Sequence, residues 1–201
     1  MKTLLISFAL AASALASAVP SSGFSSSCPA SERVLVETHN VTAGGHEFQV
    51  STKACSAEIL AAHSAQESKE LQKRQTFDSC VGETMTFGCF GAGAGPTLAD
   101  CTALSSAMVA AFEQPGQPIL FTVLAGFVQE FSHGTCLYAW INENPAGTVT
   151  LQYCYSSVSQ DLGLTAANNC LPRGDLGGFA TASNPQLIPA SLDWVFEVVH
   201  S

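Results

Sequence analysis

Eight cysteines constrain this chain more than any other feature of its sequence. They are Cys28, Cys55, Cys80, Cys89, Cys101, Cys136, Cys154 and Cys170. An even number of cysteines behind an export signal predicts a framework of disulfide bonds, because compartments outside the cytosol are oxidising. The sequence has no Cys-x-x-Cys pair and no cysteine near a histidine at zinc-finger spacing. We therefore expect no metal site and no cofactor.

Residues 1–18 have the three parts of a signal peptide. Lys2 gives a positive charge, the run from Leu4 to Ala16 is almost wholly apolar, and Ala16-Ser17-Ala18 offers small residues to signal peptidase. The apolar run is shorter than the ~20 residues that a membrane-spanning helix needs. Later segments are also too short or too polar to span a membrane. We expect cleavage after Ala18 and release of a secreted, extracellular protein.

A dibasic pair, Lys73-Arg74, divides the rest of the chain into two parts of different character. Residues 19–74 are close to neutral and hold two cysteines, whereas residues 75–201 hold six. The second part has a single basic residue, Arg173, against ten acidic ones, a formal charge of −9. Because composition and cysteine count both change at this pair, we expect a kexin-type protease to cleave after Arg74. Residues 19–74 are then a pro-segment and residues 75–201 the mature domain.

The acidic character of residues 75–201 excludes some partners. So much negative charge repels the phosphates of DNA and RNA and the anionic headgroups of lipids. We therefore expect no nucleic-acid binding, and the molecular target remains open. In the pro-segment, Asn40-Val41-Thr42 is a glycosylation sequon. There, Cys28 and Cys55 are also placed to close a small module, while the six later cysteines leave many pairings open.

The pattern of apolar residues after Arg74 predicts strands and helices in a defined order. Val149, Leu151 and Tyr153 alternate with polar residues, which indicates a half-buried strand, and Thr97 is placed to cap an amphipathic helix. The predicted strands are 83–89, 119–123, 135–141, 148–155 and 194–199, the predicted helices are 97–112 and 157–169, and 172–189 is a predicted loop. This order predicts an α+β fold: a two-layer sandwich of an antiparallel sheet with two helices on one face.

The pro-segment has a simpler pattern. Residues 33–38 and 47–51 alternate on either side of Gly44-Gly45, which predicts a hairpin, and residues 56–72 favour a helix. We expect this segment to pack as a small chaperone-like or inhibitory module, or to be an N-terminal appendage.

Residues 75–201 show little that indicates catalysis. They contain two histidines, His133 and His200, and neither a Gly-x-Ser-x-Gly nor a His-Glu-x-x-His motif. Glu130 and Glu143 flank a central hairpin and would suit glycoside hydrolysis if their carboxyl groups lay about 5–9.5 Å apart. The glycine-rich stretch 91–95 is more typical of a tight turn than of a phosphate-binding loop. The sequence therefore favours a non-enzymatic protein, with a small extracellular hydrolase as the alternative.

Aromatic residues raise the possibility of sugar stacking. Tyr138, Trp140 and Tyr153 stand at alternating positions of predicted strands. This placement is more typical of a core than of a binding platform.

Part of the chain resembles a known family of secreted proteins. Ala99-Asp100-Cys101 begins an amphipathic helix, a strand follows, and Gly134-Thr135-Cys136 begins another strand. Over residues 80–170 this arrangement resembles the cysteine-rich necrosis-inducing effectors of plant-pathogenic fungi, which share an α/β sandwich with some fungal killer toxins. The overall layout also resembles uncharacterised secreted proteins of mushroom-forming fungi. The resemblance implies an effector-like or toxin-like protein, and a fungal cell-wall or matrix protein is a further alternative.

Overall fold

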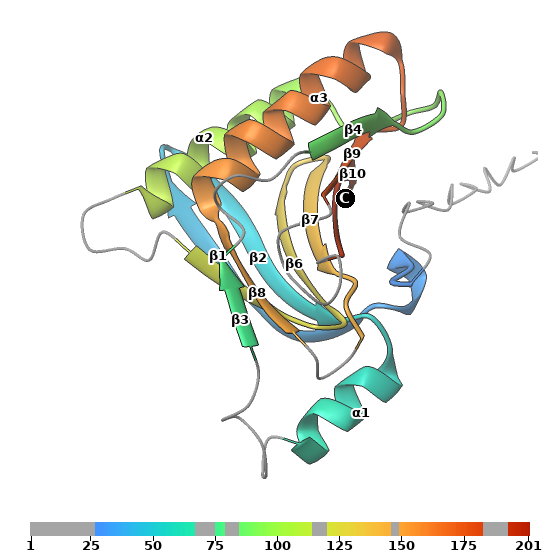
Figure 1. Cartoon of the computed structure of the whole chain (residues 1–201). Coiled ribbons are helices and arrows are strands. Elements are labelled where there is room, and N and C mark those ends of the chain that lie inside the picture. The colour runs from blue at the N-terminus through green and yellow to red at the C-terminus, as the bar shows by residue number, and fades with distance from the viewer. Residues whose placement is uncertain (1–26, 67–74, 79–84, 114–119, 146–148, 183–192) are drawn as a thin grey trace, which may run out of the picture.

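The computed structural model describes the following residues: 27–66, 75–78, 85–113, 120–145, 149–182 and 193–201. They form a seven-stranded antiparallel sheet with helices packed on it, together with a small three-stranded sheet (Figure 1). The predicted α+β fold is therefore confirmed.

The large sheet draws its strands from both sides of the dibasic pair. In spatial order they are β1 (Val34–Ala43), β2 (His46–Ala54), β6 (Phe127–His133), β7 (Cys136–Asn142), β10 (Trp194–His200), β9 (Gly178–Ala182) and β4 (Met85–Cys89). The small sheet has β8 (Val149–Cys154) at its centre, with β3 (Gln75–Asp78) parallel to it and β5 (Leu120–Leu124) antiparallel to it.

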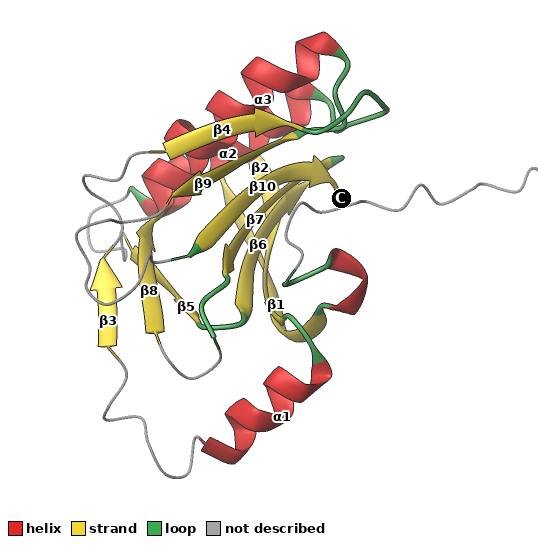
Figure 2. Cartoon of the chain, turned by 45° about the vertical axis from the view of Figure 1, so that its right-hand side comes forward, coloured by secondary structure: helices red, strands yellow, loops and turns green. Residues whose placement is uncertain are grey.

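Two helical segments cover one face of the large sheet. They are α2 (Leu98–Phe112) and the continuous pair η2 (Ser157–Leu164) and α3 (Thr165–Cys170). Figures 1 and 2 show them side by side above the strands, as the sequence predicts. A shorter helix, α1 (Ala57–Gln66), lies at the opposite end of the molecule, and two single turns, η1 (Ala30–Glu32) and η3 (Leu171–Arg173), complete the helices of the described residues.

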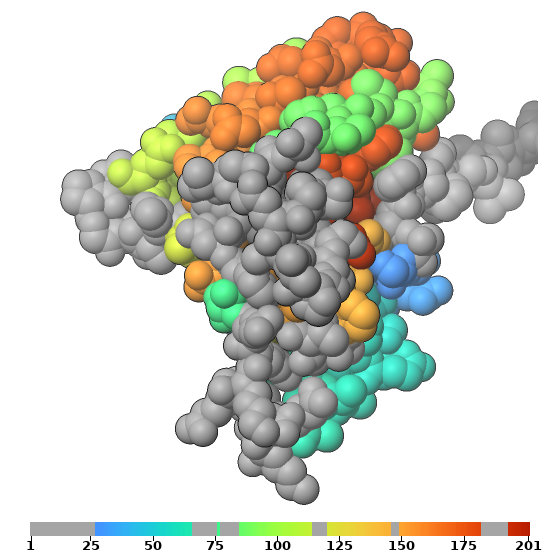
Figure 3. Space-filling view, viewed as in Figure 1, coloured from blue at the N-terminus to red at the C-terminus, as the bar shows by residue number. Residues whose placement is uncertain are grey.

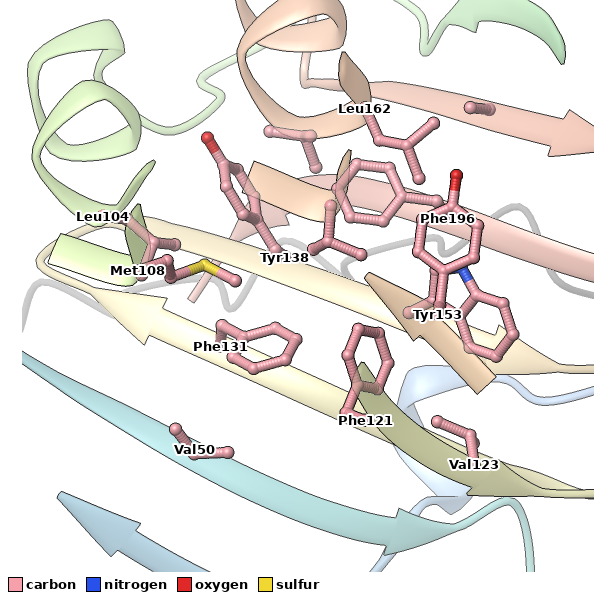
Figure 4. Packing of buried hydrophobic residues seen from close by; sticks show 14 of the residues in the cluster. Val50, Leu104, Met108, Phe121, Val123, Phe131, Tyr138, Tyr153, Leu162 and Phe196 are labelled. Atoms are coloured by element: carbon pink, nitrogen blue, oxygen red, sulfur yellow. The ribbon is translucent and has the colours of Figure 1, made fainter. Parts of the chain in front are cut away.

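The main core lies between the large sheet on one side and the helices and small sheet on the other (Figure 4). Tyr138, Trp140 and Tyr153 are each fully buried there, so they are core residues and not a sugar-stacking surface. Leu151 is buried beside them, which confirms the predicted buried face of β8. Gly163 is needed for this packing, because a Cβ atom on it would lie 2.4 Å from the ring of Tyr138.

Helix α2 begins where its sequence predicts. The Thr97 hydroxyl accepts a hydrogen bond from the Asp100 amide at 3.1 Å, which satisfies one of the free donors of the first turn. The Asp100 carboxylate in turn accepts hydrogen bonds from the Thr135 amide (2.9 Å) and hydroxyl (2.6 Å). A disulfide from Cys101 to Cys136 adds a covalent link between α2 and β7.

We expect Asp100→Asn to destabilise the protein more at pH 7 than at pH 3. Hydrogen bonds from the Thr135 hydroxyl and amide, then from Thr97, hold the pKa of Asp100 below its ordinary value of 3.8. A carboxyl group whose pKa is lowered by folding stabilises the fold above its unfolded pKa, and this contribution is lost as pH falls through the folded pKa, below about pH 4. Urea unfolding of both proteins at the two pH values measures the difference. An equal loss at both pH values would contradict the prediction.

Three strands do not follow from the sequence pattern. Strand β6 is buried on both faces from Phe127 to Phe131, so it lacks the alternation that marks a half-buried strand. Strand β9 lies inside the stretch 172–189 that we predict as a loop, so that prediction is wrong at 178–182. Four of its five residues are small, Phe179 being the exception, and its pairing with β10 and β4 decides its conformation. Strand β3 has four residues, which is too short for a pattern.

The N-terminal hairpin is an integral part of the large sheet. It turns at Gly44 and Gly45, whose φ angles of 59° and 82° suit glycine. Strand β2 then pairs with β6 from Gln49 opposite Ser132 to Ala54 opposite Phe127. The predicted hairpin is therefore present, but it lies within the sheet and not beside it.

Candidate functional site

A group of four charged side chains lies on the face of the large sheet that the helices do not cover. The register places Glu130, Ala139 and Glu197 in one row across β6, β7 and β10. The two carboxylates are therefore two interstrand spacings apart, about 10 Å. The small side chain of Ala139 lies between them, and Arg33 bridges the gap.

Arg33 contacts both carboxylates of this row. Its Nη1 lies 3.1 Å from Oε1 of Glu130 and its Nη2 lies 3.0 Å from Oε2 of Glu197. Its Nε and Nη2 also donate to the carbonyl oxygen of Cys28, at 3.2 and 3.1 Å. Lys53 completes the group, with Nζ 2.7 Å from the other oxygen of Glu130. We call Arg33, Lys53, Glu130 and Glu197 the charge cluster.

The charge cluster is buried and electrically balanced. The side chains of Arg33 and Glu197 are each 1% exposed, and that of Glu130 is 6% exposed. Buried carboxylates require partners of opposite charge, because a charge loses its hydration when it leaves water. Here two cations, both from residues before the dibasic pair, meet two carboxylates from residues after it. Both oxygens of Glu130 are engaged in ion pairs, one with Arg33 and one with Lys53.

The structure does not bring Glu130 and Glu143 together. Glu143 lies four residues beyond Ala139, the register partner of Glu130, which is about 13 Å along an extended chain. Its Oε1 accepts a hydrogen bond from the Ser27 hydroxyl at 2.7 Å. The two carboxylates therefore have different partners, Ser27 for Glu143 and the pair Arg33 and Lys53 for Glu130.

Neither histidine of residues 75–201 is placed as a catalytic base by the described residues. Nδ1 of His133 lies 2.6 Å from the carbonyl oxygen of Glu47, and the His133 ring packs edge-to-face with His46 at 5.4 Å. His200 is exposed, with Nδ1 2.9 Å from the carbonyl oxygen of Ser201. In both rings Nδ1 lies beside a main-chain carbonyl oxygen.

Disulfides link elements that are distant in sequence. The structure pairs Cys28 with Cys55, Cys89 with Cys170, and Cys101 with Cys136. Cys154 is also disulfide-bonded, and Cys80 lies outside the described residues. Asp175 lies near Cys89 and Cys170 at a spacing that suits a metal ion. The two sulfurs are bonded to each other, so they cannot act as thiolate ligands.

Two cavities among the described residues lie beside elements that Figure 3 shows far apart, α3 with β4 for one cavity and α1 for the other. The first, of about 340 Å³, lies between β1, β2 and β6 of the large sheet, β5 of the small sheet, and α1. We call it the intersheet cleft. The second, of about 360 Å³, lies between β4 and α3, beside Cys89 and Cys170, and is also lined by Asn169 and Arg173.

Other sequence predictions lie on the surface or outside the described residues. Asn40 lies on exposed β1, where its amide donates to Glu47 at 2.8 Å, and its glycosylation stays a prediction. The signal peptide at residues 1–18 and the processing residues Lys73 and Arg74 lie outside the described residues. No helix among the described residues is long and apolar enough to cross a membrane.

Sequence reasoning missed Arg33, Lys53 and Glu197 as members of a cluster. One signal for it was present, because Glu197 is the single charge inside the apolar run from Trp194 to Val199. A carboxylate at such a position in a central strand needs a cation nearby. Its partner lies 164 residues away, so the pairing itself required the tertiary structure.

Searches against protein-family models, curated proteins and solved structures find no match to this chain.

Proposed function

We propose that this chain is a secreted, non-enzymatic protein, effector-like or toxin-like, that acts on another organism or on a cell surface. Three described disulfides support an extracellular location, because such bonds persist in oxidising compartments. The proposal that the protein is not an enzyme rests on the ion pairs of Glu130. Its two oxygens are bound by Arg33 and Lys53, so the best sequence candidate for acid–base catalysis has a structural role.

The proposal includes maturation by cleavage after Arg74. It differs from the sequence prediction in that residues 19–74 remain part of the mature protein. Strand β2 pairs with β6, and the cations of the charge cluster precede Arg74 while its carboxylates follow it. We therefore infer that residues 19–74 stay bound after cleavage and that the acting protein contains both segments. No observation favours the hydrolase, whose candidate carboxylates lie on separate, already paired sites.

Applying the purified protein to plant leaf tissue and to yeast tests this function. Full-length protein secreted by a yeast host is expected to cause necrosis of the leaf or to slow yeast growth. The same protein after reduction and alkylation should do neither, because its disulfides maintain the fold. Lesion area and growth rate are the measurements. Folded protein that produces neither effect would contradict the proposal and favour the cell-wall alternative.

A further inference from the structure

The intersheet cleft has the size of a small-molecule site. Its volume of about 340 Å³ lies at the lower end of the range of known ligand sites, about 300–1,000 Å³. Residues of β1, β2 and β6 form one wall, residues of β5 form the opposite wall, and Leu60, His63 and Ser64 of α1 complete the lining. The cleft thus requires elements from both sides of Arg74.

One wall of the cleft carries a row of polar side chains. The register aligns Glu37, Thr52 and Gln129 across β1, β2 and β6. The Thr52 hydroxyl lies 3.1 Å from Oε1 of Glu37 and 3.2 Å from Oε1 of Gln129, and its one hydrogen can serve only one of them at a time. Gln129 is 8% exposed and is held in place by a bond from its Nε2 to the Ser51 carbonyl at 3.2 Å. The row therefore offers acceptors with unused capacity, one held in place on Gln129 and one on the exposed side chain of Glu37.

His63 adds a further polar group to the lining of the intersheet cleft. It lies on α1, with its ring edge-to-face against Phe127 at 5.1 Å. Its Nε2 is shielded from solvent and has no hydrogen bond to the described residues. A buried nitrogen without a partner is unfavourable, because it has given up its bond to water. A ligand hydroxyl group that reached this nitrogen would relieve the cost.

The remaining lining of the cleft restricts what can bind. Val123 and Leu124 of β5 and Leu60 of α1 give it apolar surface opposite the polar row, and Phe127 adds apolar surface beside Gln129 on β6. Glu37 is the only acid in the described lining, and neither lysine nor arginine is present there, so anions are disfavoured. A ligand that suits both walls has hydroxyl groups on one side, carbon–hydrogen surface on the other, and no negative charge.

We propose that the intersheet cleft binds a neutral, hydroxyl-rich ligand, namely one sugar unit of an extracellular glycan. A sugar ring has hydroxyl groups at its edge for Glu37, Gln129 and His63, and a carbon–hydrogen face for Phe127. The other cavity suits this ligand less well, because it is lined by Arg173 and a disulfide. This sugar-binding proposal is independent of the proposed toxin-like function, because a protein without toxic activity can bind the same sugar.

Isothermal titration of the full-length folded protein with oligosaccharides tests the site. We expect at least one of the neutral glucose-, mannose- or N-acetylglucosamine-based tetrasaccharides to bind saturably, with a Kd of about 1 mM or tighter. A tetragalacturonate, which is anionic, should not bind. Binding of the anion alone, or of no neutral saccharide, would overturn the proposal.

Two variants locate the binding within the cleft. Thr52→Val removes one hydroxyl and keeps the shape, and Gln129→Leu removes the fixed amide. Each is expected to weaken binding about tenfold, the loss of one buried hydrogen bond or more. Asn169→Ala, in the other cavity, is the matched control and should bind within about twofold of the wild type. Thermal unfolding confirms that all three proteins are folded. Wild-type affinity in both cleft variants would contradict the assignment.

Discussion

Replacing Arg33 with methionine is expected to lower the free energy of unfolding by about 3–5 kcal/mol, the usual cost of breaking a buried ion pair from one side. Methionine fills a similar volume but supplies no charge. Glu197 then loses its ion pair with Arg33. Among the residues of the charge cluster, Lys53 is then the single cation for two carboxylates. Urea unfolding of the full-length protein, followed by tryptophan fluorescence, measures the loss.

Two further variants show whether the loss has this cause. Arg173→Ala also removes an arginine from an ion pair, but this side chain is 69% exposed, so we expect a change below about 1 kcal/mol. Adding Glu197→Gln to Arg33→Met removes one of the buried negative charges and should recover part of the stability. If the double variant is no more stable than Arg33→Met, charge balance is not what Arg33 provides.

Residues 75–201 produced alone are expected not to fold into a stable domain. Without residues 19–74, β6 loses its partner β2 and becomes an edge of the sheet, and Glu130 and Glu197 lose the two cations of the charge cluster. An exposed, apolar edge strand also promotes aggregation. Far-UV circular dichroism and size-exclusion chromatography of the truncated chain measure the effect.

Cleavage of the full-length protein after Arg74 provides the matched comparison. Each of the three described disulfides lies wholly on one side of this bond, so pairing between strands and the charge cluster must hold the fragments together. We expect the two fragments to elute as one species under native conditions and to separate in denaturant. A truncated chain as stable as the full-length protein would refute the dependence on residues 19–74.

The elements that could be predicted from sequence are those whose signals are local. Helix α2 has its cap at Thr97 and an apolar face at three- and four-residue steps, and β8 alternates in a way that its half-buried position requires. Strand β6 could not be found in this way, because both of its faces are covered and its only charge, Glu130, is paired with residues far away in sequence. Strand β9 consists of small residues apart from Phe179, and pairing with β10 and β4 holds it in place.

The candidate site followed less well from sequence than the fold did. Glu130 was selected as a possible catalytic residue because it is an acid near a hairpin, which is a local property. Its partners Arg33 and Lys53 come from a segment that the dibasic pair marks as removable. The intersheet cleft likewise combines Thr52 and His63 with β5, so no local pattern could have indicated it.

By itself, the sequence determined the disulfide bonding and the α+β class, because each depends on composition or on neighbours within a few residues. The export signal and the division at Lys73-Arg74 have the same local basis and stay predictions. Only the tertiary structure decided that the segment before Arg74 supplies β1 and β2 of the large sheet and the cations of its buried carboxylates. The physical reason is that strand pairing and ion pairing depend on distance in space. Residues 33 and 197 meet at 3.0 Å although 164 residues separate them.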